Sequence, residues 1–386
     1  MRRTSLSSPG KEITITIRGN WKPTLYDTLT GSISPVPFEI TAEGTRIKAK
    51  LYAYDSLLLK LEPTTASGST FGFDLLANRK IASKVIDFKS AVAVHRTEDN
   101  VILLDMAQWS EDGETFFPID EIRIIDSSLR KKYGYPKATG QDLQPWCIAS
   151  ENCNQYVWLK FSVNTAFDVH TRLAYEAAET IWVDDKEISK TINGYYTDRM
   201  IVTTPLPQLT TGTHEITIKV PFGKRESLEN MFLLGDFDVT VSGIECTLLP
   251  PSRKLPFGDL SHMGMPFYGA AVDYELPFEL EKDANVQITA QNYRGALLNV
   301  KLDGTDIGRI IFAPYRLDLG KLSKGKHTVT ITAVLTRHNS FASLHNISND
   351  VYMGGKYFFP KGDLYAYEYQ TVPTGILQSP RLEIYE

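Results

Sequence analysis

Hydrophobic and polar residues alternate along this chain over many short stretches, each followed by turn-forming residues. Glu12 to Arg18 reads EITITIR, and a longer stretch beginning at Tyr156 reads YVWLKFSV. A period of two residues is typical of a β-strand with one buried and one exposed face. Short helices are expected only at Ser127 to Tyr133, after a possible cap at Asp126, and near Glu226. The pattern therefore predicts an all-β protein.

One β module occurs twice. Leu206 to Val220, LPQLTTGTHEITIKV, returns as Leu319 to Ala333, LGKLSKGKHTVTITA. Upstream of each copy, IWVDDKEI from Ile181 and VKLDGTDI from Val300 both read as a strand, a tight acidic turn and a returning strand. A repeat of this kind indicates a duplicated structural unit. We therefore expect the two copies to superpose.

The repeat carries a matching pair of histidines. His214 and His327 each follow a glycine by two residues, and Gly212 and Gly325 suit backbone positions that need a positive φ. Histidines at matching sites invite a metal-binding or catalytic interpretation. The simpler interpretation is a half-exposed histidine that starts a strand and needs no partner. We adopt the simpler one.

Composition places the chain among ordinary globular proteins. Its 386 residues are 42% hydrophobic and 23% charged, enough for about two to three domains and too apolar for disorder. A net charge of −5 gives no indication of a nucleic-acid or anionic-membrane partner. Three cysteines without a CxxC spacing indicate free thiols. The sequence contains neither an apolar signal-peptide core nor a membrane-spanning run, so a cytoplasmic location is the default expectation.

Several motifs resemble one family of enzymes. Gly-Asn-Trp, Tyr-Asp-x-x-Thr-Gly and Asp-Ser-Leu-Leu-Leu occur in this order between Glu12 and Pro63, as in the β domain that follows the catalytic barrel of large bacterial glycoside hydrolases. Leu228 to Val239, LENMFLLGDFDV, resembles the strand that closes a jelly roll in glycosidases of family 2 and in α-L-rhamnosidases of family 106. Met265 to Gly269, MPFYG, is similar to part of their terminal jelly roll.

The resemblance implies three all-β domains and a function in glycoside degradation. A small β-sandwich module is expected at residues 1–75, a first galactose-binding-like jelly roll at 76–255 and a second at 256–386. No alternation of strands with long helices occurs, so the resemblance places the catalytic barrel upstream of Met1. The implied partners are a carbohydrate and that barrel. No cofactor is expected, although a structural calcium remains open.

Catalytic carboxylates are not assigned. A glycosidase needs two carboxyl groups across the bond that it cleaves, whereas Glu226 and Glu229 would share one short turn. The resemblance makes Glu229 and Asp236 structural. Two alternatives stay open beside an accessory region of a larger enzyme: a stand-alone carbohydrate-binding or interaction protein, and a complete all-β sugar-active enzyme with an unrecognised site.

Sugar-binding modules of this shape place aromatic and hydrogen-bonding side chains in loops at the end of the sandwich. The loop RHNSFASLHN, which begins at Arg337, gathers several such groups and is the strongest candidate, although it would equally suit a brace between two domains. The candidate carbohydrate-binding residues are Trp146, Tyr195, Tyr293, Arg316, Arg337, His338, Asn339 and His345.

Overall fold

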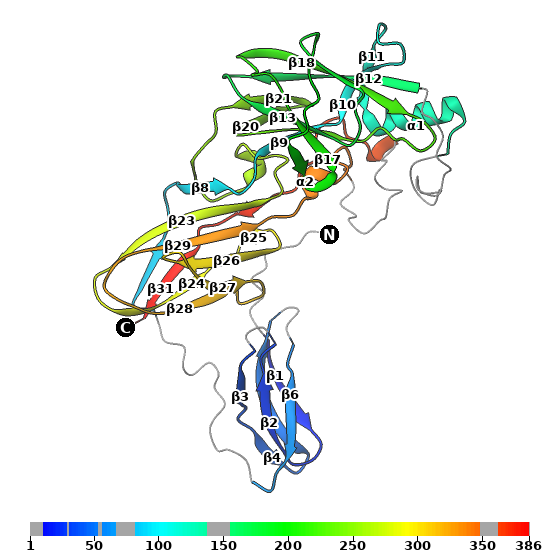
Figure 1. The fold of residues 1–386 in the computed structure, drawn as a ribbon. Helices are drawn as coiled ribbons and strands as arrows, with labels where there is room; N and C mark the ends of the chain where they lie inside the picture. Colours follow the sequence, from blue (N-terminus) through cyan, green and yellow to red (C-terminus); the bar gives the residue numbers. More distant parts are fainter. Residues whose placement is uncertain are drawn as a thin grey trace.

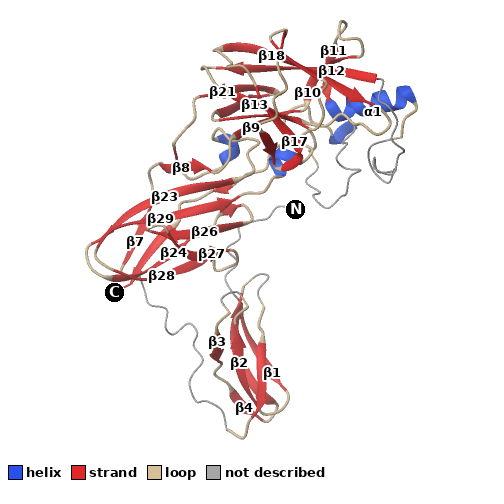
Figure 2. Ribbon diagram, viewed as in Figure 1, coloured by secondary structure: helices blue, strands red, loops and turns tan. Residues whose placement is uncertain are grey.

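The computed structural model describes residues 11–28, 31–52, 56–66, 82–136, 155–347 and 362–385. These residues form groups of antiparallel sheets (Figure 1), and helix is confined to short pieces (Figure 2). The prediction of an all-β fold is confirmed. No helix in these ranges is long and apolar enough to cross a membrane.

The N-terminal strands form two small three-stranded sheets. The first has the order β1-β5-β4 and the second β3-β2-β6. Their bounds are β1 Lys11–Ile17, β2 Trp21–Tyr26, β3 Ile33–Pro35, β4 Glu39–Thr41, β5 Gly44–Leu51 and β6 Leu59–Pro63. Gly44 has a φ of 132°, and a Cβ there would collide with the carbonyl oxygen of Ile17, so glycine is required at this crossing.

The strands β9 to β21 form two facing sheets, which we call the first sandwich. One has the order β11-β10-β12-β18-β14-β15, with β20 and β21 attached beside β12, and the other has the order β16-β17-β13-β19-β9. Their bounds are β9 Asn100–Leu104, β10 Met106–Ser110, β11 Phe117–Glu121, β12 Gln155–Thr165, β13 Thr171–Tyr175, β14 Thr180–Val183, β15 Lys186–Glu187, β16 Gly194–Tyr196, β17 Asp198–Pro205, β18 Gly212–Phe222, β19 Met231–Gly235, β20 Asp238–Ser242 and β21 Glu245–Leu249.

A second sandwich has sheets of the order β22-β8-β23-β29-β26-β27 and β28-β24-β31-β7. Its bounds are β7 Lys84–Asp87, β8 Val92–Arg96, β22 Lys254–Leu255, β23 Ala271–Leu280, β24 Ala284–Thr289, β26 Leu297–Leu302, β27 Thr305–Ile310, β28 Arg316–Leu322, β29 Gly325–Val334 and β31 Arg381–Tyr385, with the small pair β25 Tyr293–Arg294 and β30 Gly375–Ile376 beside them. Short helical turns are η2 Leu260–His262, α2 His338–Phe341 and η4 Gly362–Leu364.

Two strands lie in a different sandwich from the one that the sequence assigns to them. The expected first jelly roll spans residues 76–255, but β7 and β8 pair with β31 and β23 of the second sandwich. Chain order favours pairing with the next strands along the sequence, whereas these two strands complete sheets whose other members begin at Lys254 or later. The chain therefore passes through the second sandwich before it builds the first.

The repeat forms the same hydrogen-bonded turn in both sandwiches. His214 Nδ1 lies 2.7 Å from an Asp184 carboxylate oxygen, and His327 Nδ1 lies 2.8 Å from Asp303. Each aspartate has a positive φ, near 50°, and also accepts the backbone N–H of the residue after the histidine. The structural interpretation of the histidines fits this geometry, but the expectation that they need no partner is wrong. Each histidine holds the acidic turn that precedes its strand.

The predicted helix near Ser127 is present but begins earlier. α1 covers Ile122–Tyr133, and Asp126 lies inside it rather than at its cap. Asp126 accepts a hydrogen bond of 2.8 Å from Arg130 Nε, and both side chains are buried. Arg130 also donates to the carbonyl oxygens of Lys224 and Glu226, which holds the second predicted helical segment as an extended connection. The prediction of a helix near Glu226 is therefore wrong, and carbonyl oxygens of this segment accept from a buried guanidinium instead.

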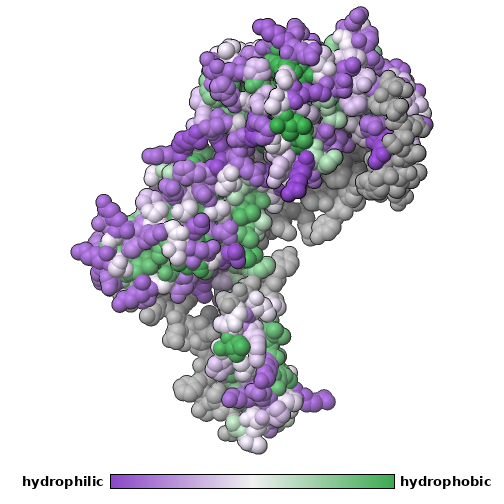
Figure 3. Space-filling model, viewed as in Figure 1, coloured by the Kyte–Doolittle hydropathy of each residue, from purple (hydrophilic) through white to green (hydrophobic). Residues whose placement is uncertain are grey.

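The two sandwiches share a polar junction, and the core of the first includes residues from later in the chain. Arg96 of β8 donates to Asp238 at 2.7 Å and to Asp236 at 3.1 Å in the first sandwich. Phe267 and Leu344, which follow the first sandwich in sequence, pack into its hydrophobic core. Figure 3 shows that hydrophilic residues cover most of the visible face of both sandwiches. The first sandwich is therefore completed by segments from the C-terminal third of the chain.

Candidate functional site

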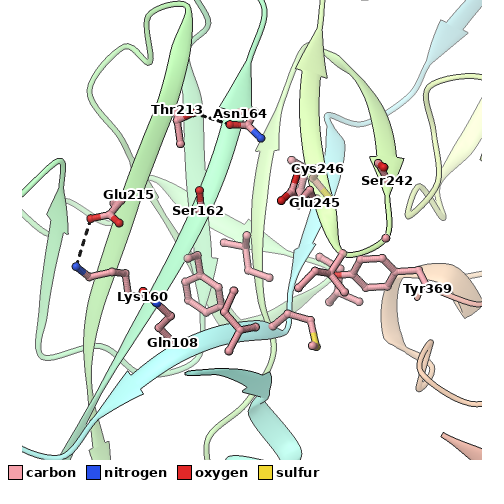
Figure 4. Close-up of a pocket in the computed structure, with 18 of the residues that line it drawn as sticks. Gln108, Lys160, Ser162, Asn164, Thr213, Glu215, Ser242, Glu245, Cys246 and Tyr369 are labelled. Carbon is pink, nitrogen blue, oxygen red and sulfur yellow. Dashed lines mark hydrogen bonds and ion pairs between the residues drawn. The ribbon is translucent and has the colours of Figure 1, made fainter. Parts of the chain in front are cut away.

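One sheet of the first sandwich is split. Along one edge β12 pairs with β18 over its whole length. Along the other edge β12 pairs with β10 up to Lys160 and with β21 from Asn164, so no described strand pairs with residues 161–163 on that side. A strand edge without a partner presents free backbone donors and acceptors. A cavity of about 900 Å³ opens at this split (Figure 4).

Part of the cavity lining is apolar and comes from residues 102–104 of β9, Met106 and Ile119. Polar side chains of β12 also line it, because successive residues of a strand face opposite sides of the sheet. Phe161 and Val163 of β12 point into the core, whereas the alternate positions Lys160, Ser162 and Asn164 point outward. Neighbouring strands and the β20–β21 hairpin add further groups with hydrogen-bonding capacity, which are Gln108, Thr213, Glu215, Ser242 and Glu245.

Two contacts orient the groups on the β12–β18 side of the cavity. Thr213 donates to the amide oxygen of Asn164 at 2.7 Å, which leaves the Asn164 NH₂ group as a donor. Lys160 Nζ lies 3.3 Å from a Glu215 carboxylate oxygen. Glu215 therefore presents its second carboxylate oxygen as an acceptor. The wall offers donors and acceptors side by side in fixed positions.

The opposite wall carries the rings of Tyr367 and Tyr369. Tyr369 donates its hydroxyl hydrogen to Asp105 at 2.7 Å, and its ring centroid lies 4.9 Å from that of Phe267 and 4.8 Å from that of His345. Burial, reinforced by the Asp105 carboxylate, raises the pKa of Tyr369 well above its ordinary value, so the hydroxyl stays protonated. The ring is thus held rigidly at the edge of the cavity.

Behind this wall lies a buried polar cluster. His345 is fully buried, with Nδ1–H donating to the Ala366 carbonyl at 3.0 Å and Nε2 lying 3.4 Å from Asp105. Burial lowers the pKa of His345, but the hydrogen bond and charge of Asp105 outweigh it, and the pKa is raised. Burial also raises the pKa of Glu121 to about 7. His345 and Asp105 fasten the 365–369 segment to the first sandwich, and neither they nor Glu121 line the cavity.

The loop that begins at Arg337 lies between the two sandwiches. Arg337 donates to Glu98 at 2.6 Å. Asn339 is buried and forms two hydrogen bonds, of 2.9 and 3.0 Å, with the backbone of Val372. Together with buried His345, these contacts give the loop the geometry of an inter-domain brace, the alternative that its sequence left open.

The other sequence candidates lie apart from one another. Tyr293 is buried, with its hydroxyl 3.2 Å from the Ile310 carbonyl oxygen. Tyr195 is 56% exposed on the edge strand β16, Arg316 is exposed at the start of β28, and burial lowers the pKa of His338. Trp146 lies outside the described residues. None of the seven described candidates lines the cavity.

Sequence reasoning missed the residues of the cavity, although part of their signal was present. The stretch from Tyr156 has polar residues at its outward positions, which marks an exposed face but not a binding site. What makes the site is the split between β10 and β21, and strand periodicity does not encode it. Within the described ranges, no group of three or more His, Cys, Asp or Glu side chains is placed to hold a metal ion.

Comparison with known proteins gives remote similarities. No protein-family model matches the chain. No curated protein matches it either. Solved structures similar to it include a rhamnosidase from Novosphingobium sp. PP1Y, with 12% identity and a TM-score of 0.35 over 98% of this chain and 22% of that one.

Two further similar structures are the exo-chitosanase CsxA from Amycolatopsis orientalis and a β-D-mannosidase from Dictyoglomus thermophilum. The first has 11% identity and a TM-score of 0.26 over 62% of this chain and 29% of that one. The second has 9% identity and a TM-score of 0.21 over 66% of this chain and 31% of the mannosidase. This chain thus spans between 22% and 31% of the length of these three proteins. With scores this low, we base the function on the residues of the cavity.

Proposed function

We propose that this chain is a non-catalytic carbohydrate-binding region of a glycoside hydrolase, and that the cavity between β10, β12 and β21 takes the sugar. The observation that carries the proposal is the lining of that cavity, in which fixed donors and acceptors face a rigid aromatic wall. The sequence resemblance to the β region of glycoside hydrolases leads to the same class of ligand, and the catalytic barrel of the proposed enzyme would lie upstream.

The lining suits the amphipathic character of a sugar ring. The edges of a sugar carry hydroxyl groups, each both donor and acceptor, and these match Asn164, Ser162 and the free oxygen of Glu215. Hydrogen bonds to the charged Glu215 and Lys160 are stronger than those to neutral groups. The apolar face of a sugar suits the tyrosine rings opposite. A cavity of about 900 Å³ lies within the range of small-molecule sites, which is roughly 300–1,000 Å³.

A binding role fits this cavity better than glycoside cleavage. The acid of a glycosidase is a carboxyl group whose pKa is raised and which faces the sugar. Near the cavity, the carboxyl group with a raised pKa is Glu121, and it is not among the lining residues. Glu215 does line the cavity, but its carboxylate is paired with Lys160 Nζ at 3.3 Å.

The test is binding by the full chain to an array of plant and bacterial cell-wall glycans, followed by calorimetric titration of the strongest hit. Asn164→Ala removes one donor and should weaken binding by about three- to tenfold. Ser162→Trp fills the cavity and should abolish binding. Glu279→Ala, at the position of the second sandwich that corresponds to Asn164, is the matched control and should leave affinity unchanged.

Two results would contradict the proposal. One is the absence of any bound glycan on the array. The other is a bound glycan whose affinity is the same for Ser162→Trp as for the unmodified chain. Measured hydrolysis of the bound glycan by the isolated chain would replace the binding role with the catalytic alternative.

A further inference from the structure

A second hollow adjoins the first. Its volume is about 640 Å³, and it lies where the first sandwich meets Leu255, residues 261–264, and Glu368, Tyr369 and Thr371. Gly243 and Tyr369 line both hollows. The two spaces are therefore neighbours that share a boundary.

The boundary is made of one hairpin tip and one ring. Ser242 and Gly243 form the exposed tip of the β20–β21 hairpin, and Gly243 has a φ of 65° that a tight turn requires. The Tyr369 ring lies near this tip, with Ser242 on the same side of the first hollow (Figure 4). Because its hydroxyl is bound to Asp105 and its ring contacts Phe267 and His345, Tyr369 keeps this position without a ligand.

The second hollow has the same mixed chemistry as the first. Apolar atoms of Leu255 and Met263 lie beside the hydroxyl groups of Thr240 and Thr371. Asp238 lines the hollow too, but its carboxylate is already bound to Arg96 and to the backbone N–H of Ser252. The groups left for a ligand are the hydroxyls of Thr240 and Thr371 together with the side chains of His262 and Glu368, next to apolar surface. This mixture again suits the edge and face of a sugar unit.

We infer that the chain binds an extended oligosaccharide, with one end in the first hollow, a unit stacked on the Tyr369 ring and further units in the second hollow. This inference rests on the proposed function and adds to it the length of the ligand. Each additional unit that reaches the second hollow adds contacts, while the loss of rotational and translational freedom on binding occurs once. Affinity therefore rises with chain length until both hollows are occupied.

The experiment titrates the full chain with a length series, from one to about six sugar units, of the glycan that binds best on the array. The dissociation constant should fall by at least about tenfold between the short and the long members and then level off. Thr240→Trp fills the second hollow from the exposed face of β20. It should remove this length dependence and leave the affinity for the shortest ligand unchanged within about twofold.

Controls separate the possible failures. Thr371→Trp fills the second hollow from the other wall and replaces Thr240→Trp if that variant does not fold. Glu279→Trp, an exposed tryptophan far from both hollows, should keep the full length dependence. An affinity that does not change with length, or one that Thr240→Trp and Thr371→Trp lower equally for short and long ligands, overturns the inference and leaves the proposed function intact. Absence of binding to every glycan overturns both.

Discussion

The two sandwiches have the same strand order but different edges. β12, β18 and β14 correspond to β23, β29 and β26, and His214 and His327 occupy equivalent places in them. In the first sandwich the outer edge of the long strand is shared between β10 and β21, which leaves the split. In the second, β8 pairs with Val272 to Glu275 on that edge, and no other strand of the described ranges pairs with β23 there. One additional hairpin thus distinguishes the outer edges of the two long strands.

Residues at corresponding positions show the same difference. The registers align Ser162 with Pro277 and Asn164 with Glu279. Proline has no N–H to donate, so the second sandwich lacks a backbone donor where the first has an unpaired edge. A shared fold therefore fixes where the strands lie, and the edge residues fix whether a ligand can bind there.

The largest expected difference between the sandwiches concerns the buried arginine of α1, an element that the second sandwich lacks. Arg130→Met removes the charged partner of the buried Asp126 carboxylate and the hydrogen bonds that Arg130 donates to the carbonyl oxygens of Lys224 and Glu226. Loss of one partner of a buried ion pair costs about 3–5 kcal/mol in the free energy of unfolding. Urea unfolding followed by fluorescence measures this change.

The matched control is Arg309→Met in the second sandwich. Arg309 is exposed and donates to Asn299 at 3.2 Å, so its removal should change the free energy of unfolding by less than about 0.5 kcal/mol. Equal effects of the two substitutions would show that α1 is not part of the stability of the first sandwich.

A smaller effect is expected from Glu121, which also belongs only to the first sandwich. Burial raises its pKa to about 7, against about 4.3 in an unfolded chain, so the folded state prefers the protonated form. Stability from this group is complete below about pH 4.3 and is lost as the pH rises through 7, by on the order of 3 kcal/mol. Glu121→Gln should therefore raise the melting temperature at pH 8 and leave it unchanged at pH 4.

The control for this pH dependence is Glu279→Gln, an exposed glutamate of the second sandwich. It should leave the melting temperature unchanged at both pH values. A Glu121→Gln variant that is less stable than the unmodified chain at pH 8 would mean that the Glu121 carboxylate is stabilised in the fold, contrary to its burial.

The smallest effects test what the sandwiches share. His214→Gln and His327→Gln each remove a histidine–aspartate contact and should lower the free energy of unfolding by about 0.5–1.5 kcal/mol. The double variant should show the sum, because the two sites lie in separate sandwiches. The hydrogen bond that His327 donates to Asp303 raises the pKa of His327, so this stabilisation is greatest below the unfolded pKa of about 6.5 and fades at higher pH.

Thermal unfolding at pH 6 and pH 8.5 measures both the size and the pH dependence of these changes. A large loss of stability for one histidine substitution and none for the other would show that the two turns contribute unequally to stability, despite their matching hydrogen bonds.

The alternation of hydrophobic and polar residues was sufficient to predict the all-β class of fold, and the internal repeat was sufficient to predict the duplicated turn. A strand with one buried face needs a period of two residues, and the acidic turn needs a residue that tolerates positive φ, so both leave a local signal. The same local signals predicted the helix near Ser127, although Asp126 proved to be an internal partner of Arg130 instead of a cap.

Long-range pairing was decided only by the tertiary structure. The periodicity of β7 and β8 is the same whichever sheet they join, and their partners lie far away in sequence. Asn339 and His345 have the chemistry of ligand-binding residues, but packing between the sandwiches surrounds them with backbone partners. The cavity depends on where β10 stops and β21 starts beside β12, because an unpaired edge is a property of three strands together and of no single stretch of sequence.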